Sequence, residues 1–229
     1  MSIAIPLYLA ITPAEISRCG QLPEKPAYMA CHFSAASAGL SNLPQQETPM
    51  LILDDSLPPS GHDPQIICTQ LQQICRKFKV QYLLLDLQRP NDPETAQIVK
   101  AILDNKPCNT IVSEAYGKAL ACPLFLNSPL PHQALDEYIA PFKNRTLWLE
   151  LAVETVSYRV SKTDCTVQSV PYTPAENHCK DLHCHYNWTV YKDHIDFTLS
   201  RDRQDCDCLL KDAQGLGISG FVGLYQQFP

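Results

Sequence analysis

Residues 49–103 read PMLILDDSLPPSGHDPQIICTQLQQICRKFKVQYLLLDLQRPNDPETAQIVKAIL, and this stretch decides the fold. It holds two short apolar runs, at residues 49–55 and 81–88, each leading to a helix. Asp63 precedes Pro64 and Asp92 precedes Pro93, which is typical of an N-cap followed by the first residue of a helix. Apolar residues then recur at helical spacing: Ile67, Leu71, Ile74, Cys75 and Phe78, and later Ala96, Val99, Ile102 and Leu103. The stretch therefore predicts two consecutive β-α units.

The same alternation continues on both sides of this stretch. Further strands are predicted at residues 27–34, 109–116, 122–129, 146–152, 194–202 and 220–228, with helices around 135–142 and 206–217. Nearly continuous apolar strands separated by amphipathic helices are typical of a parallel sheet that is covered on its faces. The sequence therefore predicts an α/β fold, a (β/α)8 TIM-like barrel with inserted β-hairpins, with an open doubly wound sheet as the alternative. No glycine-rich phosphate loop follows a strand, and we expect no cofactor.

Two segments depart from the alternation. Residues 153–193 alternate polar and apolar side chains, which predicts β-hairpins with turns at Ser161–Asp164 and Lys192–Asp193. Residues 5–12 (IPLYLAIT) form either an extension of the fold or a strand of their own. We predict a single domain over residues 1–229, with the hairpins inserted at about 153–193.

Composition limits the partners and the compartment. The net charge is −6 and no basic stripe is present, which argues against a nucleic-acid partner. The apolar start has no Lys or Arg before it and is interrupted by Pro6 and Pro13, and no later run approaches the ~18 apolar residues of a membrane span. The 11 cysteines are odd in number and accompany no export signal, so we expect reduced thiols. We therefore expect a cytoplasmic protein without a membrane partner.

Functional groups of a barrel lie at its mouth, where the strands end. The polar residues that end the predicted strands are His32, Asp54, Asp55, Asp86, Gln88, Glu114, Tyr116, Asn127, Glu150, Arg201, Asp202, Tyr225 and Gln226. Each one alone is as well explained by capping the next helix or turn. Together they predict a polar cavity, in which Asp86, Gln88, Glu114 and Glu150 are the candidate catalytic residues and the others bind a ligand.

The most informative segment is YLLLDLQRPNDPE. Side chains alternate along a strand, so Asp86 and Gln88 share one face. A strand that ends in Asp-x-Glu before a loop and a helix resembles the chitinase-like glycoside hydrolases. The resemblance implies that the Glu protonates the leaving oxygen while the Asp orients the acetamide of the substrate.

In this sequence Gln88 stands at the position of that Glu. An amide can donate a hydrogen bond but cannot supply a proton as a carboxylic acid does. The resemblance therefore implies a degenerate barrel that binds a carbohydrate or related ligand with little or no hydrolysis.

Two other functions stay open. An active glycoside hydrolase would need a relocated carboxylate pair among Asp54, Asp55, Glu114, Glu150 and Asp202. A non-enzymatic structural or partner-binding protein would use the hairpins at 153–193 as its contact surface.

A run of possible metal ligands lies in the hairpin region. His178, Cys179, His183, Cys184 and His185 are followed by Cys206 and Cys208. Their spacing matches no paired zinc-ligand pattern, so we expect a solvated hairpin and no metal.

Overall fold

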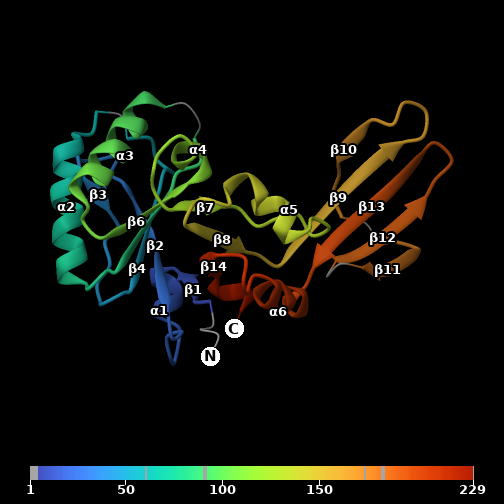
Figure 1. Ribbon diagram of the computed structural model, residues 1–229, viewed down its shortest axis with the longest axis horizontal. Coiled ribbons are helices and arrows are strands. Elements are labelled where there is room, and N and C mark those ends of the chain that lie inside the picture. Colours follow the sequence, from blue (N-terminus) through green and yellow to red (C-terminus); the bar gives the residue numbers. More distant parts are fainter. Residues whose placement is uncertain (1–4, 60, 90–91, 173, 182–183, 229) are drawn as a thin grey trace. The chain divides into compact units, whose positions relative to one another are not determined.

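The structure is a computed structural model that describes residues 5–59, 61–89, 92–172, 174–181 and 184–228. The chain forms two compact units. The barrel unit comprises residues 5–127, 144–150 and 218–228, and the sheet unit comprises residues 128–143 and 151–217. Their helices and strands are labelled in Figure 1.

The barrel unit is built on eight parallel strands that close on themselves. The strands run in the order β1-β14-β8-β7-β6-β5-β4-β2, and β1 also pairs with β2, which closes the barrel. A short strand, β3 (Leu40–Ser41), pairs antiparallel with β2. The predicted α/β barrel is therefore confirmed. Its strands are β1 (Leu7–Ile11), β2 (Pro26–Phe33), β4 (Met50–Asp54), β5 (Tyr82–Asp86), β6 (Asn109–Ser113), β7 (Leu124–Leu126), β8 (Leu147–Leu151) and β14 (Ile218–Leu224).

Two long helices cover β4 and β5 on the outside of the barrel (Figure 1). In α2 (Pro64–Lys77) the side chain of Asp63 accepts a hydrogen bond from the Gln65 backbone, and in α3 (Pro93–Asn105) Asp92 accepts one from Thr95. Both predicted caps are therefore confirmed. The apolar faces of the helices pack against the outward-facing leucines of the strands. The shorter helices are α1 (Pro13–Ile16), α4 (Glu114–Gly117) and the 3-10 helix η2 (Tyr225–Gln227).

The barrel interior is filled by the alternate, inward-facing side chains. The rings of Tyr8, Tyr82 and Trp148 lie with their centroids 5.0–5.7 Å apart. A Cβ atom at Gly220 would lie 2.4 Å from the Trp148 ring, so the large ring requires glycine opposite it. The interior is therefore a packed core and not a pore.

The sheet unit holds a five-stranded antiparallel sheet in the order β10-β9-β13-β12-β11. The predicted hairpins are confirmed: β9 turns into β10 through residues 162–166, and β12 turns into β13 through residues 191–193. The elements of this unit are α5 (Leu135–Ile139), the 3-10 helix η1 (Ala140–Phe142), β9 (Glu154–Ser161), β10 (Val167–Ser169), β11 (Asn177–Asp181), β12 (Cys184–Val190), β13 (His194–Arg201) and α6 (Arg203–Asp212).

One of the eight strands predicted for the barrel does not belong to it. Residues 194–202 do not belong to the barrel, because β13 pairs antiparallel with β9 and β12. The eighth barrel strand is instead β1, which lies between β14 and β2. Of the two interpretations of residues 5–12, the one that makes them a strand of their own is therefore right. In the part of the chain that the structure describes, no helix has the length and apolar character needed to cross a membrane.

Candidate functional site

The barrel mouth brings Asp54, Asp86 and Gln88 together. Asp54 and Asp86 are register partners at the ends of the adjacent parallel strands β4 and β5. Two residues earlier on each strand, Ile52 and Leu84 face the barrel interior, so alternation directs the two aspartates to the same side. The Gln88 side chain donates from Nε2 to Oδ1 of Asp86 at 2.5 Å. Asp86 and Gln88 thus share the face that the strand pattern predicts.

Asp86 lies in an unfavourable place for a charged carboxylate. Burial raises its pKa, the hydrogen bond from Gln88 offsets part of this rise, and the charges of Glu150, Asp54 and Asp55 raise the pKa further. Glu150 follows the inward-facing Trp148 by two residues on β8, which places it at the same mouth. A carboxyl group whose pKa is raised by burial and by nearby carboxylates is a candidate functional group.

The backbone that carries Gln88 is held from the end of β4. Asp55 is only 5% exposed, and its two carboxylate oxygens accept hydrogen bonds from the backbone N–H of Gln88 at 3.1 Å and of Arg89 at 2.8 Å. The Arg89 side chain in turn donates to the carbonyl oxygen of Ser56 at 2.9 Å. Asp55, predicted as a ligand-binding residue, therefore fixes the loop beneath Gln88.

Two hydroxyl groups, from Ser113 and Tyr116, also hold the loop that carries Gln88. Ser113, at the end of β6, donates to the Leu87 carbonyl at 2.7 Å and accepts from the Leu87 N–H at 3.1 Å. The hydroxyl of Tyr116 donates to the Arg89 carbonyl and accepts from the Asp92 N–H. Ser113 was not among the predicted site residues, and the only signal for it in the sequence is that it ends the apolar run of β6.

Two of the remaining predicted residues flank this group. His32, near the end of β2, is the register partner of Asp54, and its Nδ1 lies 3.0 Å from the Ala30 carbonyl oxygen. Because a carbonyl oxygen only accepts, this contact places a proton on Nδ1. Glu114 begins α4 and forms an ion pair with Lys118 at 3.2 Å.

The other predicted residues of the barrel unit follow β7 and β14. Asn127 follows β7 and is exposed. Tyr225 and Gln226 begin η2 after β14, and Gln226 donates from Nε2 to the Glu15 carboxylate at 2.5 Å. That these residues bind a ligand stays a prediction.

Arg201 and Asp202 belong to the sheet unit, so the reasoning that placed them after a barrel strand was wrong. The guanidinium of Arg201 is buried and donates to the hydroxyl of Ser128 at 2.8 Å and to the carbonyl of Leu130 at 3.1 Å. Asp202 is the N-cap of α6. Both side chains therefore have structural contacts within their own unit.

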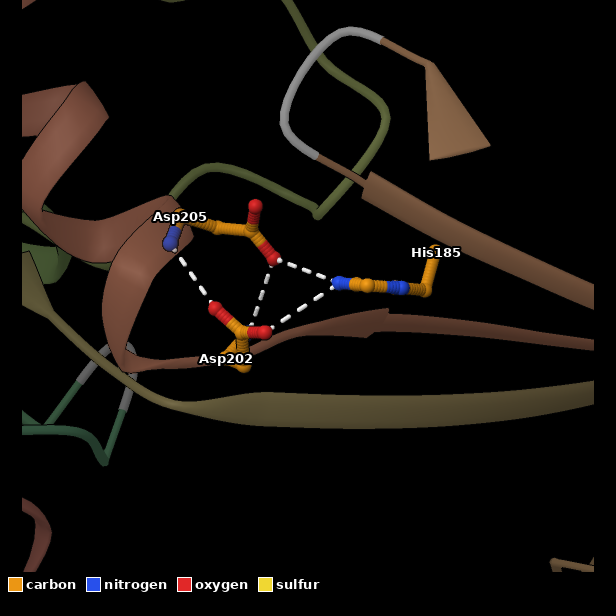
Figure 2. Close-up of side chains that lie close together, drawn as sticks. All are labelled: His185, Asp202 and Asp205. Atoms are coloured by element: carbon orange, nitrogen blue, oxygen red, sulfur yellow. Dashed lines mark hydrogen bonds and ion pairs between the residues drawn. The ribbon is translucent and has the colours of Figure 1, made fainter. Parts of the chain in front are cut away.

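The sheet unit holds a second polar cluster, in which His185, Asp202 and Asp205 point toward one another (Figure 2). Nε2 of His185 lies 3.2 Å from Oδ2 of Asp202 and 3.3 Å from Oδ2 of Asp205. Among the described residues this is the one group of three side chains with metal-ligating atoms within 4.8 Å of one another. Residue types and spacing alone would allow a divalent cation there.

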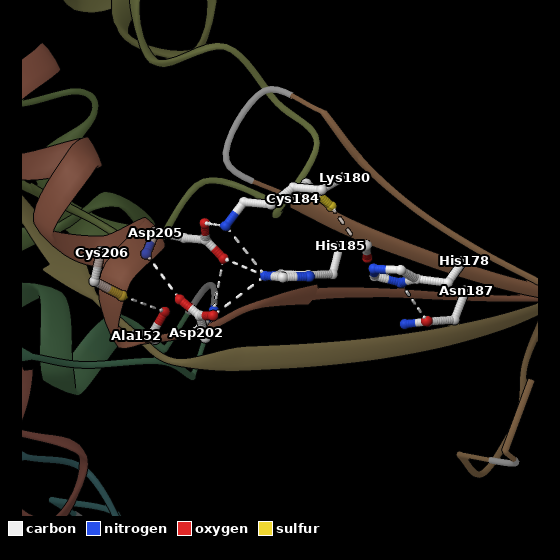
Figure 3. A network of polar contacts seen from close by, with 9 residues as sticks. All are labelled: Ala152, His178, Lys180, Cys184, His185, Asn187, Asp202, Asp205 and Cys206. Atoms are coloured by element: carbon white, nitrogen blue, oxygen red, sulfur yellow. Dashed lines mark hydrogen bonds and ion pairs between the residues drawn. The ribbon is translucent and has the colours of Figure 1, made fainter.

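The hydrogen bonds favour a structural interpretation of this cluster. The two aspartates form a capping box, in which the Asp205 N–H donates to Asp202 at 2.9 Å and the Asp202 N–H donates to Asp205 at 3.0 Å. The ammonium of Lys180 lies 2.7 Å from Oδ1 of Asp205 and 3.3 Å from Nε2 of His185 (Figure 3). Oδ1 has no other polar partner among the described residues, so Lys180 supplies the positive charge that a metal ion would bring.

His178, Cys179 and Cys184 of the His/Cys run lie outside this cluster. The ring of His178 stacks on that of His185 with centroids 5.7 Å apart, and its Nδ1 donates to Oδ1 of Asn187 at 2.9 Å (Figure 3). Cys184 is buried and Cys179 is exposed, while His183 falls outside the described residues. The contacts therefore join β11 and β12 to the start of α6.

No family model matches the sequence, and no curated protein matches it. Solved structures do match its fold. The spore cortex-lytic enzyme SleL of Bacillus cereus is 10% identical with a TM-score of 0.56, over 100% of this chain and 72% of that one. A chitinase from Chromobacterium violaceum is 10% identical with a TM-score of 0.52, over 98% and 95%. A double mutant of a GH18 chitinase from Cycas revoluta, in complex with (GlcNAc)4, is 11% identical with a TM-score of 0.54, over 95% and 94%.

These likenesses concern the fold. The chain has the barrel architecture of the chitinase-like glycoside hydrolases, so the resemblance inferred from the strand that ends at Asp86 and Gln88 is confirmed at this level.

Proposed function

We propose that the chain is a degenerate glycoside-hydrolase-like barrel that binds a carbohydrate at its mouth with little or no hydrolysis. The observation that carries the proposal is the pair at the end of β5, where the Gln88 amide donates to the Asp86 carboxylate at the position that the family resemblance gives to an acid. An amide has no proton to transfer to a leaving oxygen, and general acid–base catalysis contributes about 10²–10⁴-fold to a rate. The pair keeps its hydrogen-bonding groups while it lacks the acid.

The comparison with the Cycas revoluta chitinase supports a carbohydrate ligand. That double mutant includes a replacement of a glutamate by a glutamine and is in complex with (GlcNAc)4. A barrel of this fold therefore holds a sugar chain while it carries such a substitution. In the present chain, Asp86 and Gln88 would supply hydrogen bonds to the hydroxyl or acetamide groups of a sugar.

A second function, an active hydrolase with relocated carboxylates, is favoured by one observation. The pKa of Asp86 is raised by burial and by Glu150, Asp54 and Asp55, so this carboxyl group holds a proton to higher pH than an exposed aspartate does. Pairs of carboxyl groups whose pKa values differ can divide the roles of acid and base or nucleophile. The pair predicted from the sequence lies among Asp54, Asp55, Glu114, Glu150 and Asp202, and the raised pKa adds Asp86 to that set as the candidate acid.

A thermal-shift titration tests carbohydrate binding. The unmodified protein is titrated with chito-oligosaccharides, peptidoglycan fragments and common disaccharides. A ligand that binds only the folded state adds about 2.7 kcal/mol of stability at 100 times its Kd. We expect a saturable shift with one class of sugar, and a loss of this shift in Gln88→Ala. Gln73→Ala, an exposed glutamine on α2, is the matched control. The absence of a shift over the whole panel at millimolar concentrations would contradict the proposal.

Hydrolysis assays on the sugar that binds separate the two functions. The degenerate barrel predicts no turnover by the unmodified protein and a gain of turnover in Gln88→Glu, which restores the acid. The relocated site predicts turnover by the unmodified protein that is lost in Asp86→Asn or Glu150→Gln.

A further inference from the structure

Two cysteine thiols meet on the outside of the barrel, away from the strand ends that form the mouth. Cys75 lies in the last turn of α2, and Cys108 directly precedes β6. Their Sγ atoms are 3.4 Å apart. Cys75 is buried and Cys108 is half-buried.

The backbone on both sides of this contact is fixed by regular structure. The Cys75 carbonyl accepts from the Val80 N–H at 3.0 Å, and the Asn109 N–H donates to the Gln81 carbonyl at 3.2 Å. Both cysteines pack into the same apolar layer between the helices and the strands. A disulfide has an S–S length of about 2.05 Å, so the sulfur atoms need to approach by about 1.4 Å for the bond to form.

A third cysteine of this layer, Cys31, is a poor competitor. Burial raises the pKa of its thiol to about 12, and the charges of Asp54 and Cys75 contribute to the rise. The thiolate is the reactive form, and the hydrogen bond with Cys108 lowers the pKa of Cys75, so Cys75 rather than Cys31 supplies the thiolate that starts the exchange.

We propose that Cys75 and Cys108 form an intramolecular disulfide bond when the protein meets a disulfide oxidant such as oxidised glutathione. The hydrogen bond between the two thiols lowers the pKa of Cys75 and raises that of Cys108. The Cys75 thiolate therefore attacks one sulfur of the oxidant, which forms a mixed disulfide and releases one glutathione thiolate. The Cys108 thiol gives its proton to that thiolate, attacks the Cys75 sulfur and releases the second glutathione. Two protein thiols are oxidised, one oxidised glutathione is reduced to two glutathiones, and the two thiol protons pass to them.

The position of this bond predicts its effect. It closes the segment 75–108, which contains β5 with Asp86, the loop with Gln88, and α3. Both cysteines precede their strands, β5 and β6, so they lie at the end of the barrel opposite the mouth, where residues serve stability. The bond therefore stabilises the barrel and leaves the mouth unchanged.

The full chain is equilibrated in glutathione buffers of increasing oxidising potential, digested without reduction and mapped by mass spectrometry. We expect one linked peptide pair containing Cys75 and Cys108, a loss of two free thiols from this pair, and a Tm about 5–15 °C higher that returns to its starting value with dithiothreitol. Cys68→Ser, which removes another buried thiol of α2, should keep the linkage and the reversible shift. Cys108→Ser should lose both.

The mapping of the unmodified protein decides the proposal even if a variant fails to fold. A Cys75 that stops at the mixed disulfide with glutathione, a linkage of Cys75 to Cys31, or a Cys75 that stays reduced under oxidising buffers would each overturn it. Exposed Cys165 and Cys179 will also react with the oxidant, and their peptides are distinct from the expected pair.

Discussion

At the scale of single residues, the carboxylate of Asp86 is half-buried and faces the charges of Glu150, Asp54 and Asp55. Its pKa in the folded state is therefore raised above the ordinary value of 3.8. In the pH range between these two values the folded protein binds more protons than the unfolded chain, so stability falls as the pH rises through this range. At neutral pH the charged Asp86 thus destabilises the fold.

Replacing Asp86 by Asn should remove this cost. We expect Asp86→Asn to be more stable than the unmodified protein at pH 7, and the difference to disappear below pH 3.8, where both side chains are neutral. Urea unfolding at a series of pH values measures it. Asp104→Asn removes the same charge from an exposed position on α3 and should change little. A less stable Asp86→Asn at pH 7 would show that its ionised form has favourable partners.

The residues of the mouth also show how far single positions can be predicted. That Asp86 and Gln88 share a face follows from strand alternation, which is a local property. The roles of Asp55 and Ser113 depend on contacts with residues 33 and 26 positions away in sequence. Such contacts require the strand register, which the pattern of one strand does not contain.

At the scale of elements, the loop after β5 depends on one carboxylate. Asp55 accepts both the Gln88 and the Arg89 N–H while it is almost fully buried. Asp55→Ala should destabilise the protein by about 1.5–3 kcal/mol, because it leaves two backbone donors without their charged acceptor. Equilibrium denaturation measures the loss, with the exposed Ser56→Ala as the control. If the proposed ligand binds, its affinity should fall as well. An Asp55→Ala protein as stable as Ser56→Ala would contradict this role.

The start of α6 offers a second prediction. Asp202 caps the helix through the Asp205 N–H. Asp202→Ala should cost about 1 kcal/mol. Asp207→Ala, an exposed position in the same helix, should cost much less. His185→Ala keeps the cap and removes the contact from β12, so chemical denaturation of the three variants separates the two effects. Equal losses in Asp202→Ala and Asp207→Ala would exclude the cap as the cause.

The alternation of apolar and polar residues distinguishes β13, which was wrongly predicted in the barrel, from the true barrel strand β1. β13 alternates polar His194, Asp196 and Thr198 with apolar Ile195, Phe197 and Leu199, which is typical of an antiparallel sheet with one polar face. The run of β1, LYLAI, is apolar throughout, as barrel strands that are covered on both faces are. The sequence therefore did distinguish an antiparallel strand from a barrel strand. The error arose because residues 194–202 were counted as a barrel strand to reach eight.

At the scale of the whole molecule, the barrel is closed by the two ends of the chain. β1 pairs with β14 on one side and β2 on the other, so strands more than 200 residues apart in sequence are neighbours. The barrel unit is also interrupted in sequence, because β14 follows the whole antiparallel sheet. The barrel therefore cannot close before the sheet segment has been synthesised. That residues 1–229 form one domain stays a prediction.

Removing β14 should therefore unfold the barrel unit rather than shorten it. A chain that ends at residue 217 exposes the hydrogen-bonding edges of β1 and β8 and lacks Phe221 and Val222, which are buried. Open edges and uncovered apolar surface lead to aggregation. We expect this chain to be aggregated or to show no cooperative thermal transition by circular dichroism. A chain that ends at residue 225 keeps every barrel strand and is the matched control. If the chain ending at 217 stays monomeric and unfolds cooperatively at the Tm of the control, then barrel closure by β14 contributes little to stability, and the open doubly wound sheet becomes the better description in solution.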